Sequence, residues 1–150
     1  MKLNSHTFID KKTAQQKISM ITCYDYSFAQ IINESELDCI LVGDSAAMVM
    51  HGYSSTVMID TALMAYHVAA VSRGAPKKFI IGDLPFLSYR KSLTENMNNI
   101  EALMKAGSEA LKLEGALGNL ETISHVVQSG VPVMGHLGLT PQSVHTLGGH

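Results

Sequence analysis

The sequence predicts an α/β fold in which a parallel sheet is built from successive βα units. From residue 17 onward, short apolar runs alternate with longer amphipathic segments, and the same order repeats along the chain. The apolar runs hold Ile, Val and Leu at consecutive positions, which is typical of parallel strands that are buried on both faces. We therefore expect residues 17–150 to form one domain, or one part of a domain, after a polar N-terminal extension over residues 1–16.

Five of the apolar runs are predicted to be strands. They are separated by about 20 to 40 residues, which is the spacing of βα units and not that of a short solenoid repeat. The predicted strands cover residues 18–23, 39–42, 79–81, 110–113 and 131–134.

Two helices are predicted after the first two strands. Residues 26–35 form the first helix, in which three apolar residues are expected to face the core: Phe28, Ile31 and Ile32. No glycine marks the end of this helix. The second helix begins after Asp60, a suitable N-cap, and ends at Gly74, which Pro76 follows closely.

The third and fourth helices have clear boundary signals. Ser92 and Glu95 form a capping box at the start of the third helix, which ends at Gly107. The fourth helix runs from Asn119 to Gly130, and Pro132 then begins the last predicted strand. Each helix is followed by a strand, so the pattern of βα units is unbroken.

Composition and charge favour a globular protein that binds a small molecule. Apolar residues make up 46% of the chain and charged residues 16%, which is unlike a disordered protein. Eleven basic and thirteen acidic residues give a net charge of −2, so we expect no nucleic acid and no anionic membrane as partner. The N-terminus lacks a signal peptide and no run of about 18 apolar residues occurs, which predicts a cytoplasmic protein.

Several other residue types point to structural roles. Cys23 and Cys39 lie in apolar runs without a Cys-x-x-Cys pair, which predicts buried, reduced thiols. His67 lies on the apolar face of the second helix and is expected to be a core histidine with its hydrogen bonds satisfied. Neither a GxxxxGK[ST] nor a GxGxxG motif is present, which disfavours nucleotide chemistry.

Polar side chains follow the predicted strands at the point where each strand ends: Asp25, Asp44 with Ser45, Asp83, Glu114 and His136. In a parallel barrel these strand ends lie on the face where active sites are found. We therefore expect the carboxylates of Asp44, Asp83 and Glu114 to cluster beside Lys112 and His136.

A cluster of three carboxylates favours a bound divalent cation. Without a cation the carboxylates repel one another and at least one pKa rises. Oxygen ligands suit Mg²⁺, which commonly takes one or two protein carboxylates and leaves positions for water and substrate. A 2-oxo acid could fill two of these positions, and the metal would act as a Lewis acid that stabilises the enolate formed beside the ketone.

Each of these residues also has a structural interpretation. Asp44 and Asp83 could cap or turn the loops that follow the strands, and Glu114 could be a surface carboxylate. Lys112 lies in an apolar strand and needs a charged partner if it is buried. His136 could satisfy backbone groups at its strand end. The occurrence of all five at equivalent strand ends favours a functional site.

The motifs closely resemble those of the ketopantoate hydroxymethyltransferase family over roughly residues 17–149. The matching segments are TCYDY (residues 22–26), LVGDS (41–45), HGYSST (51–56), AYHVAAVSRGAP (65–76), GDLPFLSY (82–89), LKLEG (111–115) and GHLGLTPQSV (135–144). The resemblance implies a (β/α)8 TIM barrel, of which this chain would hold about five N-terminal βα units and so an incomplete barrel. Family members are homo-oligomers.

The resemblance also implies roles for individual residues. Asp44 and Asp83 match magnesium ligands, and Glu114 matches the acid that completes the metal site. Asp44, Ser45, Asp83 and Lys112 match positions that hold the oxo acid, while Lys112 and His136 match active-site positions. The implied reaction transfers a hydroxymethyl group from 5,10-methylenetetrahydrofolate to 3-methyl-2-oxobutanoate, giving ketopantoate for pantothenate biosynthesis.

The match departs from the family pattern in ways that leave alternatives open. The family's general base, a glutamate, lies beyond residue 150, so no residue of this chain is expected to abstract the proton. Glu36 stands where the family usually has glycine, and Ala46-Ala47 where it has Leu-Gly. The alternatives are a catalytically inactive truncated fragment, an interaction half of the enzyme, and a related Mg²⁺-dependent carbon–carbon lyase.

Overall fold

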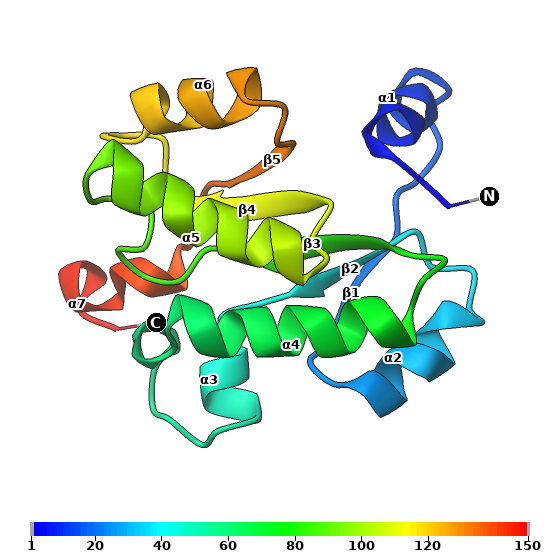
Figure 1. Ribbon diagram of the computed structural model, residues 1–150, viewed down its shortest axis with the longest axis horizontal. Coiled ribbons are helices and arrows are strands. Elements are labelled where there is room, and N and C mark those ends of the chain that lie inside the picture. The colour runs from blue at the N-terminus through cyan, green and yellow to red at the C-terminus, as the bar shows by residue number, and fades with distance from the viewer. Residues whose placement is uncertain (1, 150) are drawn as a thin grey trace.

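The computed structural model describes residues 2–149 and contains a single five-stranded parallel sheet. The strands lie in the order of the sequence, each paired with the next, as Figure 1 shows. Their bounds are β1 (Met20–Thr22), β2 (Cys39–Val42), β3 (Phe79–Asp83), β4 (Ala110–Glu114) and β5 (Val133–His136). The five predicted βα units are confirmed, although four of the predicted strand boundaries were wrong by two residues.

Three strands end later than predicted, so Asp83, Glu114 and His136 are part of the sheet. β3 was predicted to stop at residue 81, but Asp83 still pairs in register with Lys112 of β4. β5 begins two residues later than predicted, because the amide of Val131 bonds to the carbonyl of Val126 at the end of the preceding helix. Glu114 and His136 are consequently register partners on neighbouring strands.

Helices cover one face of the sheet. Figure 1 shows α4 (Thr61–Gly74) and α5 (Leu93–Ala106) side by side across it, with α2 (Tyr26–Asn33) beside α4 and α6 (Leu120–Gln128) beyond α5. The predicted caps of α4 and α5 are confirmed, because the carboxylate of Asp60 accepts from the amide of Leu63 and the Ser92–Glu95 capping box is formed. Four short helices complete the chain: α3 (Ala46–Val49), η1 (Thr56–Met58), η2 (Pro141–Ser143) and α7 (Val144–Leu147).

The predicted inward face of α2 was wrong in part. Ile32 is buried, but the side chains of Phe28 and Ile31 are 64% and 69% exposed. Residues 29, 32 and 33 form the buried stripe, because α2 packs closely on α4 where Gly74 meets Ala29. Phe28 and Ile31 consequently lie on the side of α2 that faces away from this contact.

The N-terminal extension contains helix α1 (Ser5–Thr13). The ring of Phe8 packs edge-on against that of Phe79, with the two centroids 4.9 Å apart. Lys11 forms an ion pair with Asp38, which precedes β2. Because Asp38 and Phe79 lie at the N-terminal ends of their strands, α1 is attached to the end of the sheet opposite the polar strand ends.

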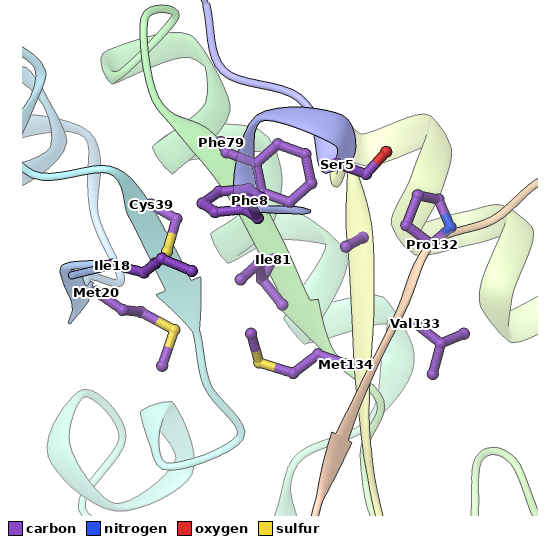
Figure 2. Close-up of a pocket in the computed structure, with 11 residues that line it drawn as sticks. Ser5, Phe8, Ile18, Met20, Cys39, Phe79, Ile81, Pro132, Val133 and Met134 are labelled. Atoms are coloured by element: carbon purple, nitrogen blue, oxygen red, sulfur yellow. The ribbon is translucent and has the colours of Figure 1, made fainter. Parts of the chain in front are cut away.

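The core has two parts, one on each face of the sheet. The larger lies between the sheet and the helices, and the smaller joins Cys39, Phe79, Ile81 and Ala110 with Phe8 of α1. An apolar cavity of about 430 Å³ lies on this second face. Met20 and Met134 are among the side chains that line it, as Figure 2 shows. Both cysteines are buried and unpaired, as predicted. Within residues 2–149, no helix is long and apolar enough to cross a membrane.

Candidate active site

The polar residues at the ends of β2 to β5 converge on one site. Asp44, Asp83, Lys112 and Glu114 are all less than 9% exposed, although each carries a charge when ionised. They line a cavity of about 380 Å³ together with Ser45 and His136, so the cavity holds all six residues that the sequence nominated. This volume suits a small ligand.

Lys112 is the cation at the centre of the cluster. Its Nζ lies 2.8 Å from Oδ2 of Asp83 and 3.6 Å from Oε1 of Glu114. These distances follow from the sheet, since Asp83 is the register partner of Lys112 and Glu114 lies two residues further along the same strand face. A buried lysine requires such partners, because an unpaired charge in the interior is costly.

Asp83 is the most buried of the acids, and only one of its two carboxylate oxygens is hydrogen-bonded within residues 2–149. Its Oδ2 accepts from Lys112 and from the backbone amide of Asp44, 3.2 Å away, but its Oδ1 is buried and has no hydrogen-bond partner among residues 2–149. Burial, together with the charge of Asp44, raises the pKa of Asp83 to about 7 despite the opposing charge of Lys112. Burial likewise raises the pKa of Asp44. A positive charge or a proton next to Oδ1 would stabilise these two acids.

Glu114 differs from Asp83 because both of its oxygens have partners. Nδ1 of His136 lies 3.0 Å from Oε1, and the backbone amide of Gln142 donates to Oε2 over 3.0 Å. His136 is itself about one-third exposed at its side chain and borders the cavity. Glu114 is thus placed to hold His136 and the loop that contains Gln142.

Gln142, in η2, is a site residue that the sequence analysis missed. Its Nε2 donates to Oδ2 of Asp44 over 2.8 Å and to the carbonyl of Leu84 over 2.9 Å. Its Oε1 accepts from the hydroxyl of Tyr89 over 2.7 Å. Gln142 lies within the GHLGLTPQSV segment, but nothing local distinguishes it from a surface glutamine, because its partners are up to 98 residues away.

The hydroxyl groups of Ser45 and Thr56 border the cavity. The hydroxyls of Ser45 and Tyr24 lie 2.8 Å apart. Thr56 of η1 is buried at the cavity wall, and its Oγ1 has no partner within residues 2–149. Asp25 does not join the site, because it caps α2 by accepting from the amide of Phe28. Of these strand-end acids only Asp25 caps a helix of the described chain, whereas neither Asp44 nor Asp83 does.

The carboxylates do not form a three-ligand metal site in this arrangement. In the described part of the chain, no three His, Cys, Asp or Glu side chains are arranged to hold a metal ion together. The reason is that Glu114 is directed toward His136 and Gln142. Asp44 and Asp83, whose unpaired oxygens remain available, are the two acids best suited to a cation.

His67, which was expected to be a satisfied core histidine, makes hydrogen bonds through both ring nitrogens. Its Nδ1 lies 2.7 Å from the carbonyl oxygen of Tyr24, and its Nε2 lies 2.7 Å from Nε2 of His51. The side chain, which belongs to α4, is half-buried. The bond to Tyr24 supports the residue that contacts Ser45.

Comparison with solved structures shows that the sheet and helices belong to a known barrel fold. The 2,3-dimethylmalate lyase of the PEP mutase/isocitrate lyase superfamily matches with a TM-score of 0.61 and 13% identity, over 98% of this chain and 60% of that chain. The phosphoenolpyruvate phosphomutase of Streptomyces platensis subsp. rosaceus matches with a TM-score of 0.60 and 10% identity, over 75% and 38%. The five parallel strands are consistent with part of a TIM barrel.

Comparison of the sequence identifies the family. Residues 2–150 match the family model described as ketopantoate hydroxymethyltransferase. The 3-methyl-2-oxobutanoate hydroxymethyltransferase of Bdellovibrio bacteriovorus is 66% identical over 95% of this chain and 54% of its own length. Its counterpart in Coxiella burnetii is 62% identical over 98% and 56%. The chain therefore spans about half the length of these relatives, and it belongs to the ketopantoate hydroxymethyltransferase family.

Proposed function

We propose that this chain supplies the metal and oxo-acid site of an enzyme that transfers a hydroxymethyl group from 5,10-methylenetetrahydrofolate to 3-methyl-2-oxobutanoate. The product would be ketopantoate, for pantothenate biosynthesis. The observation that carries the proposal is Oδ1 of Asp83, a buried carboxylate oxygen that has no partner in the described part of the chain and lies next to Asp44 in a cavity of about 380 Å³. The names and sequence identities of the relatives support it.

The donor set fits Mg²⁺. Asp44 and Asp83 offer carboxylate oxygens, thiolates are absent from the cavity lining, and Mg²⁺ characteristically binds through one or two protein carboxylates. A divalent cation would also offset the burial and the charge of Asp44, which together raise the pKa of Asp83. When bound, the ion would act as a Lewis acid for negative charge on the keto oxygen of the oxo acid. Glu114 would hold His136 and the loop that contains Gln142 in position.

The remaining polar groups of the cavity suit the binding of an anionic substrate. The ammonium group of Lys112 offsets the charge of two carboxylates and leaves the cavity less repulsive toward the carboxylate of an oxo acid. The hydroxyl of Ser45, fixed by Tyr24, can donate a hydrogen bond to that substrate. His136 can donate from Nε2 while Glu114 holds Nδ1. We assign proton abstraction to no residue of this chain.

The proposal also covers the location and the oligomeric state of the protein. We propose that the chain functions in the cytoplasm as part of a homo-oligomer. The exposed apolar side chains of α2, Phe28 and Ile31, provide surface for burial against further protein.

Calorimetric titration with 3-methyl-2-oxobutanoate tests the site. We expect binding in the presence of Mg²⁺ and at least about tenfold weaker binding without it, because the metal supplies the compensating charge. Asp83→Asn should abolish the effect of Mg²⁺. Asp10→Asn, the same change at an exposed acid of α1, should leave it intact. Equal affinity with and without Mg²⁺ would contradict the proposed site.

A product assay separates the transferase from a lyase and from a chain that is inactive by itself. The chain is incubated with Mg²⁺, the oxo acid and 5,10-methylenetetrahydrofolate, and ketopantoate is measured by mass spectrometry. Formation of ketopantoate only with the folate supports the transferase, whereas cleavage of ketopantoate without any folate supports a lyase. Binding of the oxo acid without product supports a binding half that lacks the catalytic base.

A further inference from the structure

Gln142 connects the ends of three strands through buried hydrogen bonds of its side chain and its backbone amide. Gln142 is 4% exposed and reaches Asp44 beyond β2, Leu84 beyond β3 and, through its backbone amide, Glu114 of β4. We infer that Gln142 is a positioning residue that fixes the carboxylate of Asp44 for metal binding, and that Tyr89 fixes Gln142. This inference rests on the proposed function.

The partners of Gln142 determine the orientation of its amide group. The carbonyl oxygen of Leu84 can only accept hydrogen bonds, as does the ionised carboxylate of Asp44, so the amide nitrogen must face both of them. The amide oxygen then faces the hydroxyl of Tyr89, which donates to it. That hydroxyl accepts in turn from the backbone amide of Glu114, 3.2 Å away. Every polar atom of the Gln142 side chain therefore has a partner.

This network fixes one oxygen of Asp44 and leaves the other available. Oδ2 of Asp44 is held by Gln142, whereas Oδ1 has no hydrogen bond within residues 2–149. The backbone amide of Asp44 meanwhile binds Oδ2 of Asp83, whose Oδ1 is likewise unpaired. Each of the two acids thus has one oxygen committed to the protein and one available to a cation, as is common for metal ligands with outer hydrogen-bond partners.

The substitution Gln142→Met tests the side chain alone. Methionine has a similar length and removes both amide donors, while the backbone amide that binds Glu114 is retained. We expect the affinity for Mn²⁺, measured by electron paramagnetic resonance on the metal-free chain, to fall by about 10- to 100-fold. Tyr89→Phe removes only the hydroxyl that orients the amide, so a smaller loss in the same direction is expected. Gln128→Met, at an exposed position of α6, is the matched control.

The outcomes separate this inference from the proposed function. If the unsubstituted chain does not bind Mn²⁺, the proposed metal site is wrong and the inference falls with it. If it binds Mn²⁺ but Gln142→Met and Tyr89→Phe bind equally well, the positioning role alone is refuted. Circular dichroism identifies variants that are folded, and Tyr89→Phe remains decisive if Gln142→Met does not fold. A change in the carboxyl ¹³C shift of metal-free Asp44 in Gln142→Met, absent in Gln128→Met, distinguishes positioning from general loss of stability.

Discussion

The attachment of helix α1 should depend on the ion pair between Lys11 and Asp38. The Asp38 side chain is only 9% exposed and the Lys11 side chain 23%, and Asp38 also accepts from the amide and hydroxyl of Ser19. Lys11→Met leaves this carboxylate buried without its cation. Breaking a fully buried pair costs about 3–5 kcal/mol, and the partial exposure of Lys11 reduces the expected loss to about 2 kcal/mol. Urea denaturation followed by circular dichroism measures the free energy of unfolding.

The neighbouring residue and pH provide the controls for this prediction. Lys12→Met removes the same charge from an exposed position of α1 and should change stability by less than about 0.5 kcal/mol. Burial opposes the ionisation of Asp38, but the hydrogen bonds from Lys11 and Ser19 outweigh it and lower its pKa. These hydrogen bonds therefore stabilise the folded chain at pH values above the usual carboxyl pKa, and the stabilisation is lost as pH falls through the lowered pKa of Asp38. Equal effects of the two substitutions at pH 7 would refute the reasoning.

Three further predictions concern packing, metal binding and thiol reactivity. Gly74→Ala should lower the free energy of unfolding, measured by urea titration, by about 1–3 kcal/mol. The reason is that the added Cβ would lie 2.7 Å from the Cβ of Ala29 and 2.7 Å from the carbonyl oxygen of Tyr26. Unchanged stability would mean that α2 and α4 are less closely packed. Affinity for Mg²⁺, measured by calorimetry, should rise as pH increases through about 7, because Asp83 has to lose its proton, and a constant affinity would contradict the raised pKa. Cys39 should react with iodoacetamide at pH 8 only after unfolding, because burial raises the pKa of its thiol to about 11, so rapid labelling of the folded chain would show that the thiol is accessible.

Local patterns in the sequence predicted most of the fold. The caps at Asp60 and Ser92 involve residues three apart, so the sequence alone contains both partners. The prediction for α2 was wrong in part because periodicity shows which residues are apolar but not where a neighbouring helix lies. Phe28 and Ile31 have the right spacing, yet the contact with α4 selects Ala29 and Ile32.

For the candidate site, too, some features could be predicted from the sequence and others only from the tertiary structure. Because parallel strands end on one edge, the order of strands and polar residues was sufficient to nominate Asp44, Asp83, Lys112, Glu114 and His136. The sequence by itself thus determined which charged groups meet. Only the tertiary structure decided how they are paired: Lys112 bonds Asp83, Glu114 holds His136, and Gln142 reaches Asp44 from 98 residues away. These pairings depend on strand register and on the path of the loop after β5, which arise from packing across the whole molecule and leave no local pattern in the sequence.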